Sequence, residues 1–389
     1  MNMHTKHEVT KEVLPRYLKA NKEEKRKILD EFSATTGYHR KSAIRKLREI
    51  QMTPHIKESV AGIHVRKRER MYDNYVEAVV EKIYEALGGI GSRRIHSQVS
   101  IILSKGIKFG HIKTDSITEM KVRVMSRSTL DRMITRVRER NAIKGISTTR
   151  PGTLLKSEIP LRVGVWKETD PGFFEIDLVA HCGDNGSGMF ISTLNTTDIA
   201  TGWFEAEPVM GKAQERVLAG LQEIEKRVPY PMLGIDSDNG SEFINRQLYE
   251  YCQKRKIIFT RSRPYKKNDN AHIEQKNYTT VRQVLGYQRF DTEEVFELMK
   301  TLYREPLRLY INFFQPSVKC IKKKRIGSRI KKVYDIAQTP YERVLAHPKI
   351  PEKTKETLKH LFETLDPFAL RKEINDLVRK IQKLTKWHL

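Results

Sequence analysis

The stretch GFFEIDLVAHCGDNGSGMFISTLNTTDIATGWFEAEPV, residues 172–209, contains three runs rich in β-branched and aromatic residues, separated by turn-forming residues. Such runs favour extended strands, and clusters of Gly, Asp and Asn favour the turns between them. We therefore predict three consecutive strands over 172–181, 188–198 and 202–209. The sequence Asp184-Asn185-Gly186 predicts a tight hairpin turn between the first two, because Asn and Gly tolerate a positive φ.

Helical and strand-like segments alternate after these three runs. Periodic apolar residues predict helices over 211–228, 241–256 and 270–286, and short apolar runs predict strands over 231–236 and 257–264. Three hairpin-like strands followed by alternating helices and strands predict an α/β core with a mixed five-stranded sheet and helices on its faces.

Charge is distributed unevenly along the 389 residues, whose formal net charge is +25. Residues 161–312 carry 20 Lys and Arg against 22 Asp and Glu, so the rest of the chain has a net charge of +27. Solvated surface charge would be spread through the whole sequence. Segregation into two basic flanks predicts a polyanionic partner, which we expect to be nucleic acid.

The composition, with 38% hydrophobic residues, is that of a folded chain. No apolar stretch is long enough to span a bilayer, and the first residues, MNMHTKHEVTKEV, lack the apolar segment of a signal peptide. The three cysteines are far apart and form no CxxC pair, which argues against a Cys-based zinc site. We expect a cytoplasmic, nucleoid-associated protein without a targeting signal or a membrane partner.

The N-terminal flank predicts a helix-turn-helix module over residues 1–52. One helical stretch has an apolar face, Gly37 interrupts the pattern, and a second helical stretch follows with its own apolar face. The inward residues are Ile28, Leu29, Phe32, Ile44 and Leu47. The outer face of the second helix is basic, as in helices that enter a major groove, although a solvated face is the alternative. The candidate DNA contacts there are Arg40, Lys41, Arg45 and Lys46.

A second helical module is predicted over 71–145, after a basic linker. YDNYVEAVVEKIYEAL repeats apolar residues every four positions, at 75, 79, 83 and 87, and SRSTLDRMITRVRER exposes a row of arginines. Two successive basic modules indicate a bipartite DNA-binding region, with Arg132 and Arg136 as candidate contacts.

Residues 313–389 are predicted to form a basic C-terminal region with terminal helices. IKKKRIGSRIKKVYD has strand character and favours a small DNA-contacting module, with a basic linker as the alternative. The final helix has an apolar seam only about two heptads long, so packing within the protein is favoured over a coiled coil. The seam consists of Leu370, Ile374, Leu377, Ile381 and Leu384.

Acidic residues near the predicted strand ends are the candidates for chemistry. LGIDSDNGSEFIN, residues 233–245, ends a strand with Asp236 and then Asp238 at the tip, where open α/β sheets commonly carry catalytic groups. Asp177 is inside the first predicted strand, where an isolated charge is costly unless it is paired or metal-bound. Glu274 belongs to the helix over 270–286, where an acid in the first turn can also simply stabilise the helix.

Together, EIDLVAH with Asp177, SDNGSEF with Asp238 and NDNAHIEQKN with Glu274 resemble the catalytic core of retroviral-type integrases and the related DDE transposases. Thirty-five residues separate Asp238 from Glu274, the spacing for which this family is known. The resemblance covers residues 160–312 and implies an RNase H-like fold there. The basic flanks resemble those of bacterial insertion-sequence transposases.

The sequence departs from the family pattern in two places. The Arg that usually follows the glutamate is replaced by Gln275-Lys276, although Asn277 is retained. The zinc-binding His-His-Cys-Cys domain of retroviral integrases is absent, and helix-turn-helix modules are predicted in its place. The first departure concerns only local contacts, because the three acidic residues are intact.

The resemblance implies metal-dependent cleavage of transposon ends and strand transfer into target DNA. Asp177, Asp238 and Glu274 would be the catalytic residues and the ligands of two Mg²⁺ or Mn²⁺ ions. Hard divalent ions prefer oxygen ligands, and a pair of them can activate the attacking oxygen and stabilise the leaving one. Asp236 would have a supporting role at most. The candidate DNA contacts around the glutamate are Lys266, Lys267, Lys276 and Asn277.

The implied partners are transposon-end and target DNA, with the chain assembled as a homo-oligomer. Two alternatives remain open at this point. One is a nuclease of the same fold that cleaves without strand transfer, and the other is a DNA-binding regulator derived from a transposase. The complete set of three acidic residues argues against the regulator, because binding alone does not require it.

Overall fold

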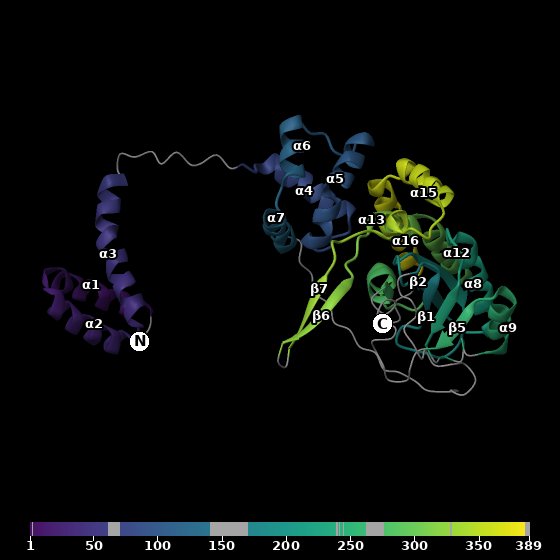
Figure 1. Ribbon diagram of the computed structural model, residues 1–389, viewed down its shortest axis with the longest axis horizontal. Coiled ribbons are helices and arrows are strands. Elements are labelled where there is room, and N and C mark those ends of the chain that lie inside the picture. Colours follow the sequence, from purple (N-terminus) through teal and green to yellow (C-terminus); the bar gives the residue numbers. More distant parts are fainter. Residues whose placement is uncertain are drawn as a thin grey trace. The chain divides into compact units, whose positions relative to one another are not determined.

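The computed structural model describes residues 1, 3–60, 71–140, 170–238, 240, 242–243, 245–261, 276–326 and 329–385. The chain forms two compact units, Met1–Arg70 and Met71–Leu389 (Figure 1). No helix within the described ranges combines the length and the apolar composition that crossing a membrane requires.

The first unit consists of three helices, α1 (Met3–Lys19), α2 (Lys22–Thr36) and α3 (Arg40–Val60), which pack against one another. A reciprocal capping box at Asn21 starts α2, and Gly37 ends it with a left-handed φ of 72°. The small core contains Leu29, Phe32, Ala43 and Leu47, with Ile44 partly buried against it. The predicted inward residues of both helices are therefore confirmed as the packed faces.

The second unit begins with four helices, α4 (Asn74–Ala86), α5 (Ser92–Lys108), α6 (Ser116–Arg123) and α7 (Arg127–Arg140). Val79, Ile83 and Leu87 are buried as their spacing predicts, whereas Tyr75 is 79% exposed. Tyr75 lies in the first turn of α4, beyond the reach of the neighbouring helices. The prediction that Tyr75 belongs to the buried apolar face was therefore wrong.

A five-stranded sheet forms the centre of the second unit. Its strands are β1 (Phe173–Ala180), β2 (Ile191–Asp198), β3 (Phe204–Met210), β4 (Gly234–Ser237) and β5 (Ile258–Arg261), in the order β3-β2-β1-β4-β5. The first three strands are antiparallel, and β4 and β5 run parallel to β1. Helices α8 (Gln214–Arg227) and α9 (Arg246–Arg255) provide the crossovers that parallel pairing requires. The predicted fold class, helical N-terminal segments followed by a mixed five-stranded α/β core, is confirmed.

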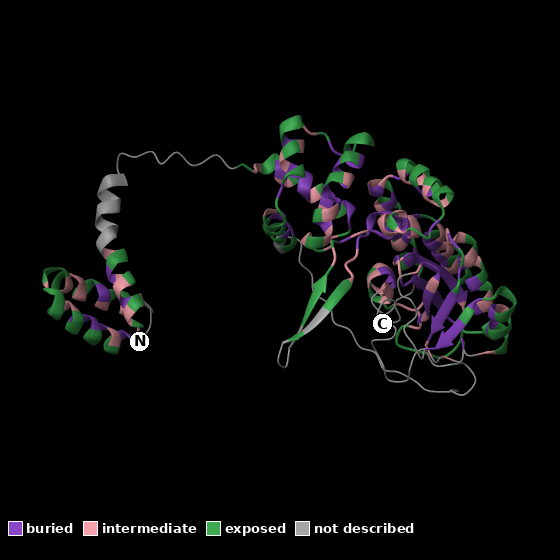
Figure 2. Cartoon of the chain, viewed as in Figure 1, coloured by how far each residue is buried: buried purple, intermediate pink, exposed green. Residues whose placement is uncertain are grey.

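The remaining helices of this unit pack on the sheet and on one another. They are η1 (Asn277–Arg282), α11 (Gln283–Leu285), α12 (Glu293–Leu302), η2 (Tyr303–Leu307), α13 (Arg308–Phe314), α14 (Pro340–Ala346), α15 (Glu352–Thr364) and α16 (Pro367–Leu384). The strands are almost entirely buried between the helical layers (Figure 2). On α16 the first four seam residues are buried and Leu384 is 36% exposed, so the predicted seam packs within the protein.

The helices of residues 71–140 share a hydrophobic core with the C-terminal helices. The Tyr310 hydroxyl donates to the Ala86 carbonyl at 2.9 Å, and Gln315 Nε2 donates to the Leu87 carbonyl at 3.0 Å. Lys105 Nζ donates to the Leu365 carbonyl at 2.9 Å. The second helical segment is thus built into the same compact unit as the sheet, instead of forming a unit of its own.

Two strands outside the main sheet, β6 (Cys320–Ile326) and β7 (Arg329–Tyr334), form an antiparallel ribbon. The ribbon extends away from the surrounding helices (Figure 1). Its strands fall within the basic stretch for which the sequence predicts strand character.

The connection between β1 and β2 differs from the predicted tight hairpin turn. It spans residues 181–190, and the Asn185 side chain accepts a hydrogen bond from the Ser187 amide at 2.9 Å. Arg289 holds this loop by donating to the carbonyls of Asn185, Ser187 and Met189. The prediction of a tight hairpin turn was therefore wrong, because a side chain from a distant segment stabilises a longer loop.

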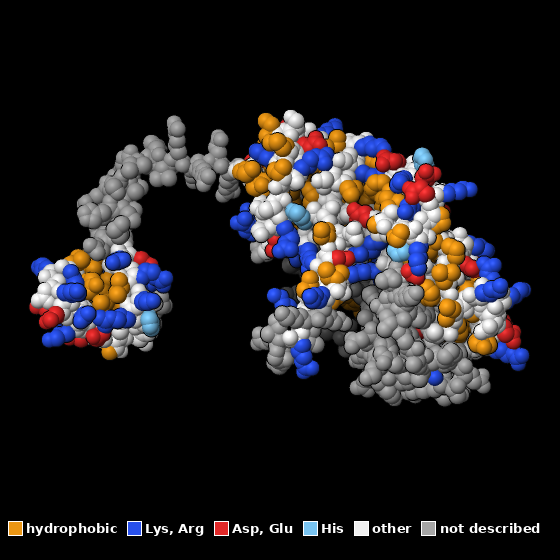
Figure 3. Space-filling view, viewed as in Figure 1, with side chains coloured by type: hydrophobic (Ala, Val, Ile, Leu, Met, Phe, Trp, Pro, Cys, Tyr) orange, Lys and Arg blue, Asp and Glu red, His pale blue; other side chains and the backbone are white. Residues whose placement is uncertain are grey.

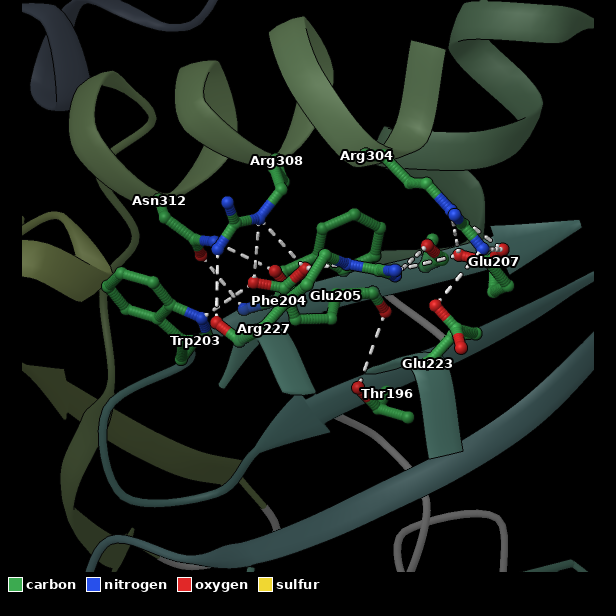
Figure 4. Close-up of polar contacts among 11 residues, drawn as sticks. Thr196, Trp203, Phe204, Glu205, Glu207, Glu223, Arg227, Arg304, Arg308 and Asn312 are labelled. Atoms are coloured by element: carbon green, nitrogen blue, oxygen red, sulfur yellow. Dashed lines mark hydrogen bonds and ion pairs between the residues drawn. The ribbon is translucent and has the colours of Figure 1, made fainter. Parts of the chain in front are cut away.

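Buried ion pairs close the outer edge of the sheet, where β3 is the last strand (Figure 4). Glu205 accepts from Arg308 Nε at 3.0 Å, Arg227 Nε at 3.2 Å and Trp203 Nε1 at 3.0 Å. Glu207 pairs with Arg304 and Arg227. The Asn312 amide exchanges two 2.8 Å hydrogen bonds with the backbone of Phe204, which satisfies part of the free strand edge.

Candidate metal-binding and catalytic site

The sheet brings Asp177 and Asp238 together. Asp177 lies in β1, and the parallel register pairs Ile176 with Ser237, the last residue of β4. Because paired residues of neighbouring strands share a face, the next residues, Asp177 and Asp238, are directed to the same side. The charge of Asp238 therefore acts on Asp177, as the pKa of Asp177 shows.

Burial, followed by nearby negative charge, raises the pKa of both carboxyl groups. The pKa of Asp177 rises from 3.8 to about 6, first through burial and then through the charge of Asp238, while the Leu178 amide and Asn277 oppose the shift. The pKa of Asp238 is raised mainly by burial, against a hydrogen bond from the Gly240 amide. A cation bound between these two neighbouring carboxyl groups would stabilise their ionised forms.

Glu242 is an acidic neighbour that the sequence interpretation did not single out. Its charge raises the pKa of both Asp177 and Asp238. Gly240 allows this arrangement, since a Cβ there would lie 2.7 Å from the Glu242 carboxyl carbon and 3.0 Å from Asp238 Oδ1. The Ser-Glu-Phe sequence after Asp-Asn-Gly was the available signal for this residue.

Asp236 is more deeply buried than Asp177 and Asp238. It is 1% exposed inside β4, and its Oδ1 accepts a hydrogen bond from the Thr260 hydroxyl at 2.5 Å. Asp238 lies beyond the end of the strand and is partly exposed. The choice of Asp238 over Asp236 as the candidate ligand stays a prediction.

A chain of amides holds Asp177 in place. Asn277 Nδ2 donates to Asp177 Oδ2, and Asn195 Nδ2 donates to Asn277 Oδ1. Asn195 lies opposite Asp177 in the register of β1 and β2 and is fully buried. The Leu178 amide donates to the other carboxylate oxygen at 2.8 Å. Each oxygen of Asp177 thus keeps a lone pair for a further partner.

A π-helical turn carries Asn277 to this position. Residues Asn277–Arg282 form η1, and Arg282 donates to the Ala180 carbonyl at 2.8 Å. In an α-helix, residues five apart are about 140° apart around the axis. The wider π turn brings Asn277 and Arg282 to one face, so both contact β1. Such turns are frequent at functional sites.

Lys276 and Asn277, two of the predicted DNA contacts, have their side chains engaged within the protein. The Lys276 ammonium lies 5.7 Å from the centroid of the Phe204 ring, and burial, followed by the charge of Arg94, lowers its pKa to about 7. The Asn277 amide is engaged by Asp177 and Asn195. We therefore assign to Asn277 the positioning of Asp177. The other two candidates of this group, Lys266 and Lys267, lie outside the described residues, as does Glu274.

The N-terminal candidates lie in the first unit, where Lys and Arg side chains are spread over the visible face (Figure 3). On α3, Arg40 pairs with Asp30, Arg45 is 3.9 Å from Glu49, and Lys46 is 2.6 Å from the same carboxylate. Lys41 is exposed.

The two α7 candidates lie in the second unit. Arg132 is exposed and donates to the Ser128 carbonyl at 3.2 Å. Arg136 is half exposed, 3.9 Å from Glu77. Their contact with DNA stays a prediction.

No group of three or more His, Cys, Asp or Glu side chains suited to a metal occurs among the residues described. Asp177 and Asp238 supply two oxygen ligands, and the third predicted ligand belongs to the segment 262–275, outside those residues. Carboxylate oxygens suit a hard divalent cation, and the raised pKa values indicate that such a cation would displace protons here. The residues present therefore fit the metal ions that the resemblance implies.

Comparison with known proteins gives one relative in sequence. Uncharacterized protein y4rM of Sinorhizobium fredii strain NGR234 is 36% identical over 346 residues, which cover 88% of this chain and 96% of the relative. The chain belongs to the y4rM family. No protein-family model matches the sequence.

Two solved structures are similar to parts of this y4rM-family chain. The catalytic core domain of BIV integrase has a TM-score of 0.30 at 16% identity and covers 48% of this chain and 98% of its own. The simian T-cell lymphotropic virus intasome in complex with PP2A regulatory subunit B56 gamma has a TM-score of 0.32 at 14% identity. The match covers 64% of this chain and 76% of the intasome chain. At these TM-scores the fold assignment depends on the strand order of the chain itself.

Asn277→Ala is expected to lower metal-dependent activity by about 10–100-fold, because residues that orient a metal ligand typically have effects of this size. The loss should appear as a higher Mg²⁺ concentration needed for half-maximal activity, with DNA binding in EDTA unchanged. Thr292→Ala, which removes the N-cap of α12 away from these residues, is the control for a general loss of stability. Full activity of Asn277→Ala at limiting Mg²⁺ would exclude a positioning role.

The raised pKa of Asp177 predicts a pH-dependent stability in the metal-free protein. The folded state binds this proton more tightly than the unfolded chain, whose Asp has a pKa of 3.8. The free energy of unfolding should therefore fall as pH rises from about 4 to about 6, by up to about 3 kcal/mol. Urea unfolding in EDTA across this interval should show a larger decrease in the wild type than in Asp177→Asn. Parallel pH curves for the two proteins would contradict the shift.

Proposed function

We propose that the chain is a DDE transposase of the integrase type, which cleaves DNA ends and transfers them to target DNA. One observation carries the proposal. Asp177, inside β1, lies beside Asp238, which directly follows the adjacent parallel strand β4, and each carboxyl group has a raised pKa. The order of β1 to β5 and the 35 residues between Asp238 and Glu274 support it.

Asp177, Asp238 and Glu274 would hold two Mg²⁺ or Mn²⁺ ions. When bound, the ions would activate the attacking oxygen and stabilise the leaving oxygen of a phosphodiester. The chain's own part is to fix the ligands. Asn277, supported by Asn195, orients Asp177, and the Gly240 amide donates to Asp238 Oδ1 at 2.9 Å.

Cleavage and strand transfer need no covalent enzyme intermediate. Water would attack the phosphodiester at the element end, and the released 3′-hydroxyl would then attack the target strand. The site therefore needs acidic ligands and space for two DNA strands, and it does not need a Ser or Tyr nucleophile.

DNA is the partner that the charge distribution favours. The basic flanks outside 161–312 carry a net charge of +27, whereas the segment with the acidic residues is nearly neutral. Binding by the flanks and chemistry by the core is the division of labour that we propose, with the chain assembled as a homo-oligomer on DNA.

The full-length protein should be tested on labelled duplexes taken from the DNA that flanks its gene. With Mg²⁺ or Mn²⁺ we expect a nick near the 3′ end, followed by joined products with a second duplex, and EDTA should remove both. Cleavage without joined products would favour the nuclease. Specific binding without cleavage under any metal condition would favour the regulator and contradict the proposal.

A further inference from the structure

We propose that the β6–β7 ribbon enters the major groove of duplex DNA and holds the substrate on the second unit. The inference rests on the proposed function, since it names a surface that would hold the DNA on which Asp177 and Asp238 act. It concerns residues 320–334, which include seven Lys and Arg and no Asp or Glu.

The ribbon carries positive charge on both faces. In the antiparallel register Lys322 is opposite Val333, and side chains alternate along each strand. Lys322 and Lys331 therefore share one face, while Arg325 and Lys332 share the other. All four side chains are exposed, and the ribbon is coloured as exposed over most of its described length (Figure 2). A strand pair that packed on a core would have one apolar face.

The base of the ribbon is fixed to the body of the second unit. Asp335 accepts from the Lys319 amide at 2.6 Å and forms a 2.9 Å ion pair with Arg343. Arg93 of α5 donates to the Asp335 carbonyl at 3.0 Å, and its guanidinium lies 5.4 Å from the centroid of the Tyr334 ring. These contacts stabilise the base of a hairpin that would be marginal alone.

Duplex DNA is the partner that matches this shape and charge. The major groove, about 12 Å wide, admits a two-stranded ribbon without distortion, whereas the minor groove, about 6 Å wide, has to be widened to accept one. Cations on both faces would lie close to the phosphates of both groove walls. Exposed lysines also prevent edge-to-edge aggregation of strands, and this is the alternative that the experiment must separate.

The test compares full-length Lys331→Ala/Lys332→Ala with Lys353→Ala/Lys380→Ala, whose exposed lysines lie on α15 and α16. Binding to a short DNA duplex is measured in EDTA over a range of salt concentrations. Two lost phosphate contacts should reduce the slope of log affinity against log salt by about 1.8, and the control should keep the wild-type slope. Lys331→Arg/Lys332→Arg should also retain it. Equal slopes for the ribbon variant and the control would overturn the proposal.

Two further measurements locate the ribbon in the groove. Guanine N7 faces the major groove, so wild-type protein should protect it from methylation and the ribbon variant should protect fewer positions. An RNA duplex, whose major groove is deep and narrow, should bind without dependence on Lys331 and Lys332. Equal dependence for both duplexes would overturn the groove placement. A protein that binds through the ribbon but never cleaves would refute the proposed function and leave this inference standing.

Discussion

Asp238→Asn is expected to abolish both Mg²⁺-dependent cleavage and joining, with DNA binding in EDTA unchanged. The substitution removes a charged ligand and keeps the size of the side chain. The loss should exceed the roughly 10–100-fold typical of residues that only support a ligand. Asp177→Asn should have the same effect, because the two carboxylates lie side by side on neighbouring parallel strands.

Asp184→Asn is a matched control, since this residue belongs to the second Asp-Asn-Gly sequence of the chain and is exposed in the β1–β2 loop. It should retain wild-type activity. Asp236→Asn should affect the chemistry less than Asp238→Asn, although it disturbs a buried contact with Thr260. Strand transfer by Asp238→Asn at a level close to wild type would show that the assignment is wrong.

Glu205→Gln is expected to destabilise the second unit by about 3–5 kcal/mol, the usual effect of breaking a buried ion pair from one side. Glu205 has no exposed side-chain surface and accepts from Arg227, Arg308 and Trp203. A neutral amide would leave the Arg308 guanidinium at the β3 edge without its counter-charge and Arg227 with Glu207 alone. Urea unfolding followed by circular dichroism should report the loss.

Glu215→Gln serves as the control for Glu205→Gln. Glu215 is exposed in the first turn of α8, and surface substitutions of this kind usually change stability by less than about 0.5 kcal/mol. If Glu205→Gln unfolded at the same urea concentration as Glu215→Gln, the ion pairs at the β3 edge would contribute no net stability.

The sheet could be predicted from the sequence because its strands depend on local patterns. The runs over 172–181 and 188–198 contain β1 and β2, and the runs over 202–209 and 231–236 cover β3 and β4 except for the last residue of each. The run over 257–264 contains β5. Asp177 was identifiable as a charge inside a strand and Asp238 as an acid at a strand tip, and the motifs of both resemble those of a known family.

The contacts that support the site could not be predicted, because they join residues distant in sequence. Asn195 is 82 positions from Asn277, and Asn277 is 100 positions from Asp177. Lys276 appeared to be a surface cation by residue type, and only the fold places it against Phe204. The tight turn at Asp184 failed for the same reason, since Arg289 supplies the stabilising contacts from another segment.

The π turn at Asn277–Arg282 makes this helix unequally tolerant of changes in length. Removing the exposed Tyr278 would leave Asn277 and Arg282 four positions apart, about 40° around an ordinary α-helix, so both could still contact β1. Inserting a residue would place them six apart, about 120° from a common face even with α-helical geometry, and one contact would be lost. Related chains can therefore shorten this turn by one residue and keep Asp177 oriented, but they cannot lengthen it.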